Sequence, residues 1–369
     1  MIAGMDAFIR WLMLLLAWCH LSAPHPISSD MTDQAARAHL QPLVQAQLND
    51  MALHRLDALK RLYIDTPASQ HALQVAEVRS DYLTRWAKMR GIQWNGVTTD
   101  LHTDGVWWVS PTRIRFSVWE RENYHYHYRT LKRHLLSFGI ASRHQLSIVD
   151  DRGTWRFASD DFFNPVLPDD MAGQTVPHQL GGTPPHYQLS ANRQKAVAYA
   201  EEYCGNAPGC GNNGRYHKDY QDYNGNGGDC TNWISQVLLA GGFPMTGEWS
   251  YDQSTDEGSP AWTNARVLAE FMSRTGRAAL IASGSYAEVT RPSPEWPHGP
   301  VQTLIPGDLL SYKEKGRIVH TAVVIGYDPK GVLLTDTHSN DRYHVPWDFG
   351  WSDKTEFFLW RVHYPGEPK

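Results

Sequence analysis

The stretch Gly-Gly-Asp-Cys-Thr-Asn-Trp-Ile-Ser-Gln, residues 227–236, predicts a glycine-rich loop that leads directly into a helix. Apolar side chains recur at helical spacing from Cys230 to Leu238, and two glycines at 241 and 242 end the pattern. Asp229 is of a residue type favoured at helix N-caps. A thiol in the first turn feels the positive end of the helix dipole, which favours the thiolate. Cys230 is therefore a candidate nucleophile, and the alternative is a buried structural cysteine.

The spacing of the other cysteines supports a special role for Cys230. Cys19 lies in an apolar N-terminal segment, and Cys204 and Cys210 bound a short loop, Cys-Gly-Asn-Ala-Pro-Gly-Cys, that can close on itself. In an oxidising compartment these two cysteines are expected to form a disulfide. Cys230 would then be the unpaired cysteine of an exported chain, and catalysis is one reason for such a residue.

The N-terminus resembles a signal peptide. Arg10 precedes an apolar run, residues 11–18, that is too short to span a bilayer. We interpret residues 1–23 as a signal peptide, or as an uncleaved anchor because Pro24 follows the candidate cleavage site. The protein is therefore expected to be exported to the periplasm, the cell envelope or the medium, with no transmembrane span beyond this segment.

The composition excludes several function classes. The 369 residues predict about two domains, and a net charge of −5 without a basic block argues against a nucleic-acid partner. No P-loop, dinucleotide fingerprint or Gly-x-Ser-x-Gly motif occurs. Residues 222–229 resemble half of a calcium loop, but Trp233 stands where the closing glutamate belongs. We predict no cofactor and no metal.

The pattern of apolar residues predicts an α+β fold in two parts. Residues 31–163 change from helical to strand periodicity after residue 90, which predicts a small α+β domain of unknown role. Residues 164–188 are rich in Pro and Gly and are interpreted as a linker. Residues 189–369 predict a second α+β domain. Its expected helices begin at Ser190, Cys230 and Ala261, and its expected strands cover residues 307–312, 318–327, 332–337 and 356–362.

A nucleophilic thiol needs a base, and the base needs a partner that orients it. His320 begins an otherwise apolar strand and is the candidate base. The backbone N–H of Cys230 is a candidate oxyanion donor, because amides at a helix start have no intrahelical partner. Asp229 either caps the helix or holds a substrate ammonium group.

The hairpin after His320 predicts the orienting residue. The turn at residues 328–331, Asp-Pro-Lys-Gly, is typical of a type I turn with a glycine bulge. Period-two alternation from that turn places residues 336, 338 and 340 on the face of His320, and residues 337 and 339 on the other face. His338 is the predicted orienting residue, and Asp336 and Asn340 are the alternatives.

Taken together, these residues resemble the bacterial "putative amidase domain" family, which is grouped with the papain-like CHAP and NlpC-type cell-wall hydrolases. The resemblance implies a papain-like fold over residues 189–369, with Cys230 as nucleophile, His320 as base and a third polar residue within 337–339. It also implies hydrolysis of an amide bond in peptidoglycan or a related peptide. The segments that carry it are residues 192–200, 228–236, 241–245, 261–264, 306–310 and 320–324.

The sequence predicts an exported cysteine amidase or peptidase that acts on a peptide or peptidoglycan substrate. Two alternatives stay open. One is a catalytically silent papain-like domain that binds cell-wall peptide or a partner protein. The other is an acyltransferase that passes a thioester to an amine.

Overall fold

The computed structural model describes residues 33–131, 133–162, 185–224, 226, 228–352 and 354–367. The predicted signal peptide and most of the predicted linker lie outside these residues. Across the described ranges, no helix is long and apolar enough to cross a membrane.

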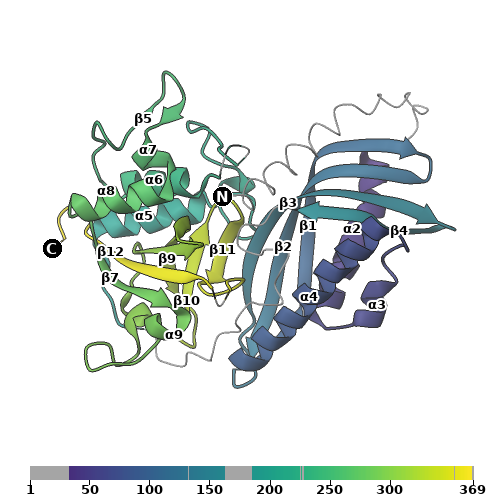
Figure 1. Cartoon of the computed structure of the whole chain (residues 1–369), viewed down its shortest axis with the longest axis horizontal. Helices are drawn as coiled ribbons and strands as arrows, with labels where there is room; N and C mark the ends of the chain where they lie inside the picture. Colours follow the sequence, from purple (N-terminus) through teal and green to yellow (C-terminus); the bar gives the residue numbers. More distant parts are fainter. Residues whose placement is uncertain are drawn as a thin grey trace.

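Helices precede strands in the N-terminal half, as the sequence pattern predicts. The helices are α2 (Asp33–Ala52), α3 (Leu56–Lys60) and α4 (Pro67–Arg90), and the strands are β1 (Ile92–Ser110), β2 (Arg113–Tyr128), β3 (Leu136–Asp151) and β4 (Thr154–Phe162). The Thr66 side chain caps α4 by accepting from the amide of Ser69, and Gly91 ends the helix in a left-handed conformation. In Figure 1, α2 and α4 lie along one face of the curved sheet.

In the C-terminal half, helices and a few short strands come first and a run of consecutive strands follows. Its elements are α5 (Ala191–Glu202), η2 (Asn212–Gly214), α6 (Cys230–Ala240), β5 (Tyr251–Asp252), β6 (Glu257–Gly258), α7 (Pro260–Thr263), α8 (Ala265–Arg274), β7 (Ala278–Ser285), α9 (Tyr286–Val289), η3 (Pro300–Thr303), β8 (Leu309–Glu314), β9 (Arg317–Tyr327), β10 (Leu333–Thr337), β11 (Asp341–Pro346) and β12 (Glu356–Val362). The helix predicted to begin at Ala261 is interrupted at Asn264, whose side chain caps α8. Strands β7 and β11 were not predicted.

One antiparallel sheet of ten strands runs through both halves. Its order is β1-β2-β3-β11-β10-β9-β8-β12-β7, and β4 also pairs with β3. The halves meet where β11 pairs with β3, with Arg342 opposite Ile140. The segments that we predicted as separate domains therefore share one sheet, and the fold is α+β.

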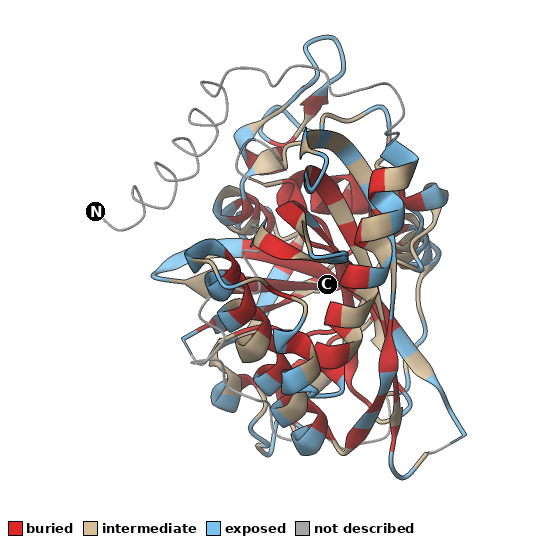
Figure 2. Cartoon of the chain, turned by 90° about the vertical axis from the view of Figure 1, so that its right-hand side faces the viewer, coloured by how far each residue is buried: buried red, intermediate tan, exposed pale blue. Residues whose placement is uncertain are grey.

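Alternation along the sheet separates two apolar cores in the C-terminal half. Leu309 and Val323 face α5, α6 and α8, whereas Leu310 and Ala322 face a second cluster that contains Trp347. Figure 2 shows buried residues concentrated along the strands and on the helix faces that pack against them. This alternation matters for the site, because successive residues of β9 reach opposite faces.

The disulfide loop between residues 204 and 210 packs against the N-terminal half. Arg121 Nε of β2 donates to the carbonyl oxygen of Asn206 at 2.7 Å. A Cβ atom added to Gly139 of β3 would lie 2.0 Å from the carbonyl oxygen of Pro208. The loop backbone therefore lies directly on β3 at a position where a side chain does not fit.

We expect Gly139→Ala to lower the free energy of unfolding by ~1–3 kcal/mol, because the added methyl group collides with backbone that cannot move aside cheaply. Gly247→Ala is the matched control, since no atom lies within 4 Å of its Cβ position, and it should stay within ~0.5 kcal/mol of the parent. Urea unfolding measures both. Equal stability of the two variants would contradict the packing of the loop on β3.

Candidate active site

Cys230 is the first residue of α6, and its side chain is buried and free of any disulfide. Its sulfur lies 3.6 Å from Thr231 Oγ1 and makes a hydrogen bond with the backbone of Thr321 in β9. The ladder between β9 and β10 runs only as far as the pair Val323–Asp336. The thiol therefore lies beside a part of β9 that is beyond the last residue pair of this ladder.

Burial raises the pKa of the Cys230 thiol, and the nearby charge of Asp229 raises it further. Hydrogen bonds with Thr231 and Thr321 lower the pKa of the thiol, but by less than burial raises it. The expectation of a thiolate favoured by the helix dipole is therefore wrong for this structure, because desolvation of the charge outweighs the dipole. The protonated thiol is therefore the favoured form at neutral pH.

His320 lies in β9 and is buried, and its Nε2 atom is 2.5 Å from Thr337 Oγ1. The Thr337 hydroxyl donates to the carbonyl oxygen of His338 at 2.9 Å, so it accepts from His320. Nε2 therefore carries the proton. In this neutral tautomer the basic lone pair is on Nδ1.

Burial lowers the pKa of His320 to about 3, with smaller contributions from the positive charges of Arg342 and His338. Its ring lies 5.8 Å from the ring of Tyr312 and 6.0 Å from that of Trp351. The imidazole is neutral at physiological pH in this aromatic setting, and a neutral imidazole can accept a proton.

A β-bulge overturns the register that we predicted for the strand after the turn. The turn itself is confirmed, because Asp328 N donates to Val332 O at 2.9 Å. However, Leu334 pairs with Gly326 while Thr335 pairs with Val324, so Ile325 has no partner. Because β9 contains one extra residue, the side chains of β10 beyond the bulge lie on the face of the sheet opposite to the one that we predicted. Thr337, which we had placed on the opposite face, consequently contacts His320.

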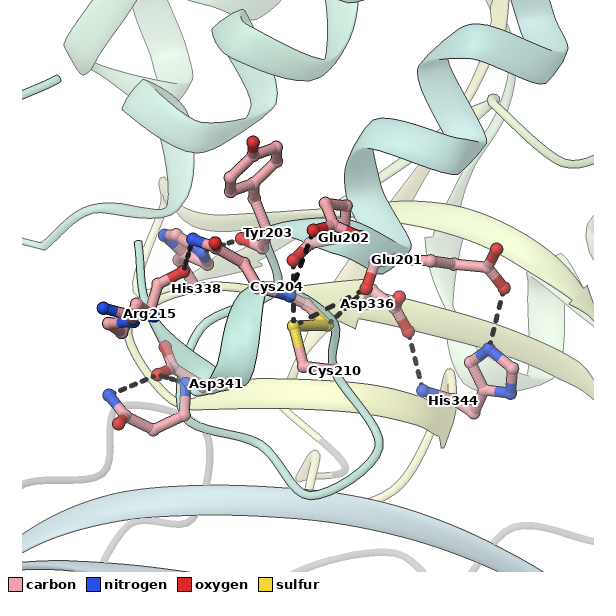
Figure 3. The surroundings of a disulfide bond; sticks show 12 residues. Glu201, Glu202, Tyr203, Cys204, Cys210, Arg215, Asp336, His338, Asp341 and His344 are labelled. Atoms are coloured by element: carbon pink, nitrogen blue, oxygen red, sulfur yellow. Dashed lines mark hydrogen bonds and ion pairs between the residues drawn. A yellow bond between two sulfur atoms is a disulfide. The ribbon is translucent and has the colours of Figure 1, made fainter. Parts of the chain in front are cut away.

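His338 is paired with Asp229 and not with His320, contrary to our prediction. Its Nδ1 atom is 2.7 Å from Asp229 Oδ2, and its Nε2 atom is 2.6 Å from the carbonyl oxygen of Tyr203. Figure 3 shows the contact with Tyr203 beside the disulfide. Both ring nitrogens are thereby engaged. The orienting contact with His320 that we predicted for His338 is made by Thr337, at Nε2.

The surroundings of His338 favour its charged form. Its ring stacks on those of Tyr216 and Trp233, with centroids 4.2 and 4.9 Å away. Burial alone would lower the pKa of His338, but the Asp229 carboxylate raises it above its ordinary value. An imidazolium can donate to both acceptors at once. His338 therefore acts as a buried cation at the start of α6.

Asp229 occupies the N-cap position, but its side chain does not cap the helix. Its Oδ1 atom accepts from the amide of Tyr223 at 3.1 Å and from Asn232 Nδ2 at 2.8 Å. Its backbone is near-helical, with φ −104° and ψ −3°, rather than extended as in a usual N-cap. The carboxylate is buried and paired with His338, an arrangement that neither predicted role foresaw.

The predicted disulfide is confirmed, with Cys204 and Cys210 joined and their Cα atoms 5.5 Å apart. Figure 3 shows it between α5 and the strands that carry Asp336 and Asp341. Asp336 Oδ1 accepts from the amide of His344 at 2.6 Å, so this alternative orienting residue is directed at β11. Burial raises the pKa of Asp336 to about 7.

Comparison with known proteins supports an amidase-domain family for the C-terminal half. Residues 190–361 match the family model described as "Putative amidase domain". A curated relative, "Uncharacterized protein YhbB" of Bacillus subtilis (strain 168), is 28% identical over 166 residues, which are 43% of this chain. The chain spans 44% of the length of that relative.

Solved structures give only remote similarities. The intermembrane space region of chloroplast protein ARC6 has a TM-score of 0.25 and 14% identity, covering 36% of this chain and 97% of that one. A scytalone dehydratase-type protein of Novosphingobium aromaticivorans DSM 12444 has a TM-score of 0.24 and 10% identity, covering 35% and 84%. A type 2 hexachlorocyclohexane dehydrochlorinase (LinA) has a TM-score of 0.24 and 15% identity, covering 35% and 85%. Scores this low carry no argument about fold or function.

We expect the stability provided by His338 to depend on pH. Because the folded-state pKa of His338 is raised, its contribution is complete below the unfolded pKa and is lost as pH rises through the folded value. His338→Gln should therefore cost about 3 kcal/mol at about pH 6 and clearly less at about pH 9. Urea unfolding at both pH values measures this difference.

The control is His125→Gln, whose side chain contacts Thr98 at the surface of β1 and β2. It should change the free energy of unfolding by less than ~0.5 kcal/mol at either pH. A cost of His338→Gln that grows with pH would refute the charged pair.

Proposed function

We propose that residues 190–361 form a cysteine-dependent amidase in which Cys230 is the nucleophile and His320 is the base. The observation that carries this proposal is the tautomer of His320. Thr337 holds the proton on Nε2, and the lone pair is left on Nδ1. The next residue of β9, Thr321, contacts the Cys230 thiol through its backbone.

The proposed reaction starts from a neutral thiol and a neutral imidazole. His320 Nδ1 takes the thiol proton as the Cys230 sulfur attacks the substrate carbonyl carbon, which forms a tetrahedral oxyanion. The imidazolium then returns the proton to the leaving nitrogen as the C–N bond breaks, and a thioester remains. Water, deprotonated by His320, attacks the thioester, and the acid product leaves with the thiol restored.

The start of α6 is suited to stabilise the oxyanion. The backbone N–H of Cys230 belongs to the first helical turn, where amides have no partner within the helix. The His338–Asp229 pair fixes the residue that precedes Cys230. We therefore assign His338 and Asp229 a positioning role, and we assign the orienting role to Thr337.

The substrate class rests on the sequence resemblance. Cell-wall hydrolases of this kind act on peptide amides of peptidoglycan, and the signal-like N-terminus would deliver the protein to that polymer. Incubation with purified peptidoglycan, followed by mass spectrometry of the released fragments, tests the proposal against Cys230→Ala. Muropeptide binding without turnover would instead favour a silent binding domain. Transfer to an added amine would favour an acyltransferase.

We expect Cys230→Ala and His320→Ala to abolish amide cleavage, and Thr337→Val to lower kcat by about 100-fold, within the range attributed to a general base. Thr337→Val keeps the shape of the side chain but removes the acceptor that fixes the tautomer of His320. Thr335→Val is the matched control, because Thr335 Oγ1 donates to the carbonyl oxygen of Val345. Equal losses in the two threonine variants would argue against the orienting role.

The pH profile provides an independent test. The base must be neutral to accept the thiol proton, and burial lowers the pKa of His320 to about 3. We therefore expect kcat/KM to persist on the acid side well below the ordinary histidine pKa of about 6.5. An acid limb at about 6.5 would mean that His320 titrates in an exposed environment, which would contradict the buried neutral base.

A further inference from the structure

A buried cluster of ionisable groups lies in the N-terminal half, far along the sheet from Cys230. It comprises Glu120 and Glu122 of β2 and His144 of β3, all at most 1% exposed. The candidate ligand atoms of the three residues lie within 4.8 Å of one another. The proposed amidase uses none of these three residues. Buried charges contribute little net stability, because the cost of removing them from water offsets their attraction, so stability alone does not explain the cluster.

Glu120 is the residue that points to a missing partner. Its Oε2 atom is buried and has no hydrogen-bond partner among the described residues. A buried carboxylate oxygen without a partner costs several kcal/mol unless a cation or a proton compensates it. The arrangement of the neighbouring groups favours a cation over a proton as the partner of this oxygen.

His144 is arranged as metal-binding histidines usually are. Its Nδ1 atom is 2.8 Å from Asp160 Oδ1, and Nε2 faces the cluster beside Ser142 Oγ at 2.9 Å. A carboxylate on one ring nitrogen fixes the tautomer and directs the lone pair of the other nitrogen to a metal. A metal ion on Nε2 would replace the Ser142 contact, so the buried Ser142 side chain would have to adopt another rotamer.

Glu122 keeps ligand capacity despite its other contacts. Arg79 Nη2 lies 3.2 Å from Oε1 and 3.4 Å from Oε2, and the Tyr124 hydroxyl donates to Oε2 at 2.5 Å. Oε1 therefore has a single long contact and retains a lone pair, since an ionised carboxylate offers about four acceptor positions.

The charge balance of the cluster leaves room for a divalent cation. The charged groups that act on Glu120 are Glu122, Asp160, Arg79 and His144. Burial raises the pKa of Glu120 to about 8, and the Asp160 and Glu120 carboxylates raise the pKa of His144 to about 9, so without a metal both groups hold a proton at neutral pH. A metal ion would displace these two protons, and the three carboxylates and one guanidinium would then leave two negative charges for it to balance. Phe162 at the end of β4 stacks on His144 at 4.7 Å and is only half-buried, so one ring separates the cluster from the surface.

We propose that Glu120, Glu122 and His144 bind a divalent first-row transition-metal ion, with Asp160 orienting His144. One imidazole and two carboxylates suit zinc, manganese or iron, and the remaining positions are open to water or a ligand. This site is independent of Cys230, and it gives the N-terminal half a chemistry of its own. It replaces our sequence-based expectation that the protein has no metal.

The test uses the full chain with Cys230→Ala in every sample, because a free thiol also binds zinc. After chelator treatment, equilibrium dialysis against Zn²⁺ with elemental analysis should give one ion per chain. Glu120→Gln keeps the shape of the side chain and should weaken binding at least about tenfold, and Asp160→Asn about 10- to 100-fold. Glu201→Gln is the matched control, since Glu201 also pairs with a histidine, His344, at 3.0 Å, and it should leave binding unchanged.

A measurement without changes in the cluster guards against variants that fail to fold. The same chain with all three ligands intact should bind Co²⁺ and give the visible absorption bands of nitrogen and oxygen coordination. Absence of Zn²⁺ and Co²⁺ binding would overturn the proposal and would mean that protons neutralise the cluster. Equal zinc affinity of Glu120→Gln and Glu201→Gln would overturn it as well.

Discussion

The pairing of β11 with β3 is the interaction on which the molecule depends. β11 forms hydrogen bonds with β10 on one edge and with β3 on the other, so it joins the two halves into one sheet. The residues between β10 and β11 are consequently held from both sides. They include His338, whose carbonyl oxygen accepts a hydrogen bond from the Thr337 hydroxyl and whose ring is paired with Asp229. The candidate active site therefore depends on contacts with the N-terminal half.

Most helices and strands could be predicted from the sequence, but the contacts of the site could not. The Cys230 helix, the turn after β9 and the disulfide follow from local patterns of glycine, proline and cysteine. The bulge at Ile325 leaves no such pattern, because an apolar residue in an apolar strand gives no sign that it lacks a partner. Because of this extra residue, Thr337 and not His338 contacts His320. β11 was missed for a related reason, since its residues, Asp-Arg-Tyr-His-Val-Pro, are mostly polar and pair with a strand about 200 positions earlier.

Burial explains why the local argument about Cys230 failed. A helix start stabilises a thiolate by a modest amount, whereas removal of the charge from water costs more when the side chain is almost fully enclosed. The same desolvation acts on His320, and it favours the neutral form there too. Both partners are therefore uncharged at rest. In the mechanism that we propose, His320 takes the thiol proton only as the sulfur attacks, so deprotonation would be linked to substrate binding.

The two buried histidine–aspartate pairs show how context gives the same contact different roles. His338 donates from both nitrogens to acceptors of the protein, Asp229 and the Tyr203 carbonyl, which leaves no lone pair and makes it a fixed cation. His144 also has an aspartate on Nδ1, but a hydroxyl that can rotate faces its Nε2. Next to it lies a carboxylate oxygen without a partner. The pKa of both histidines is raised by a carboxylate, so what distinguishes the two pairs is the second ring nitrogen. On this difference we base the proposal of a structural role for His338 and of metal binding for His144.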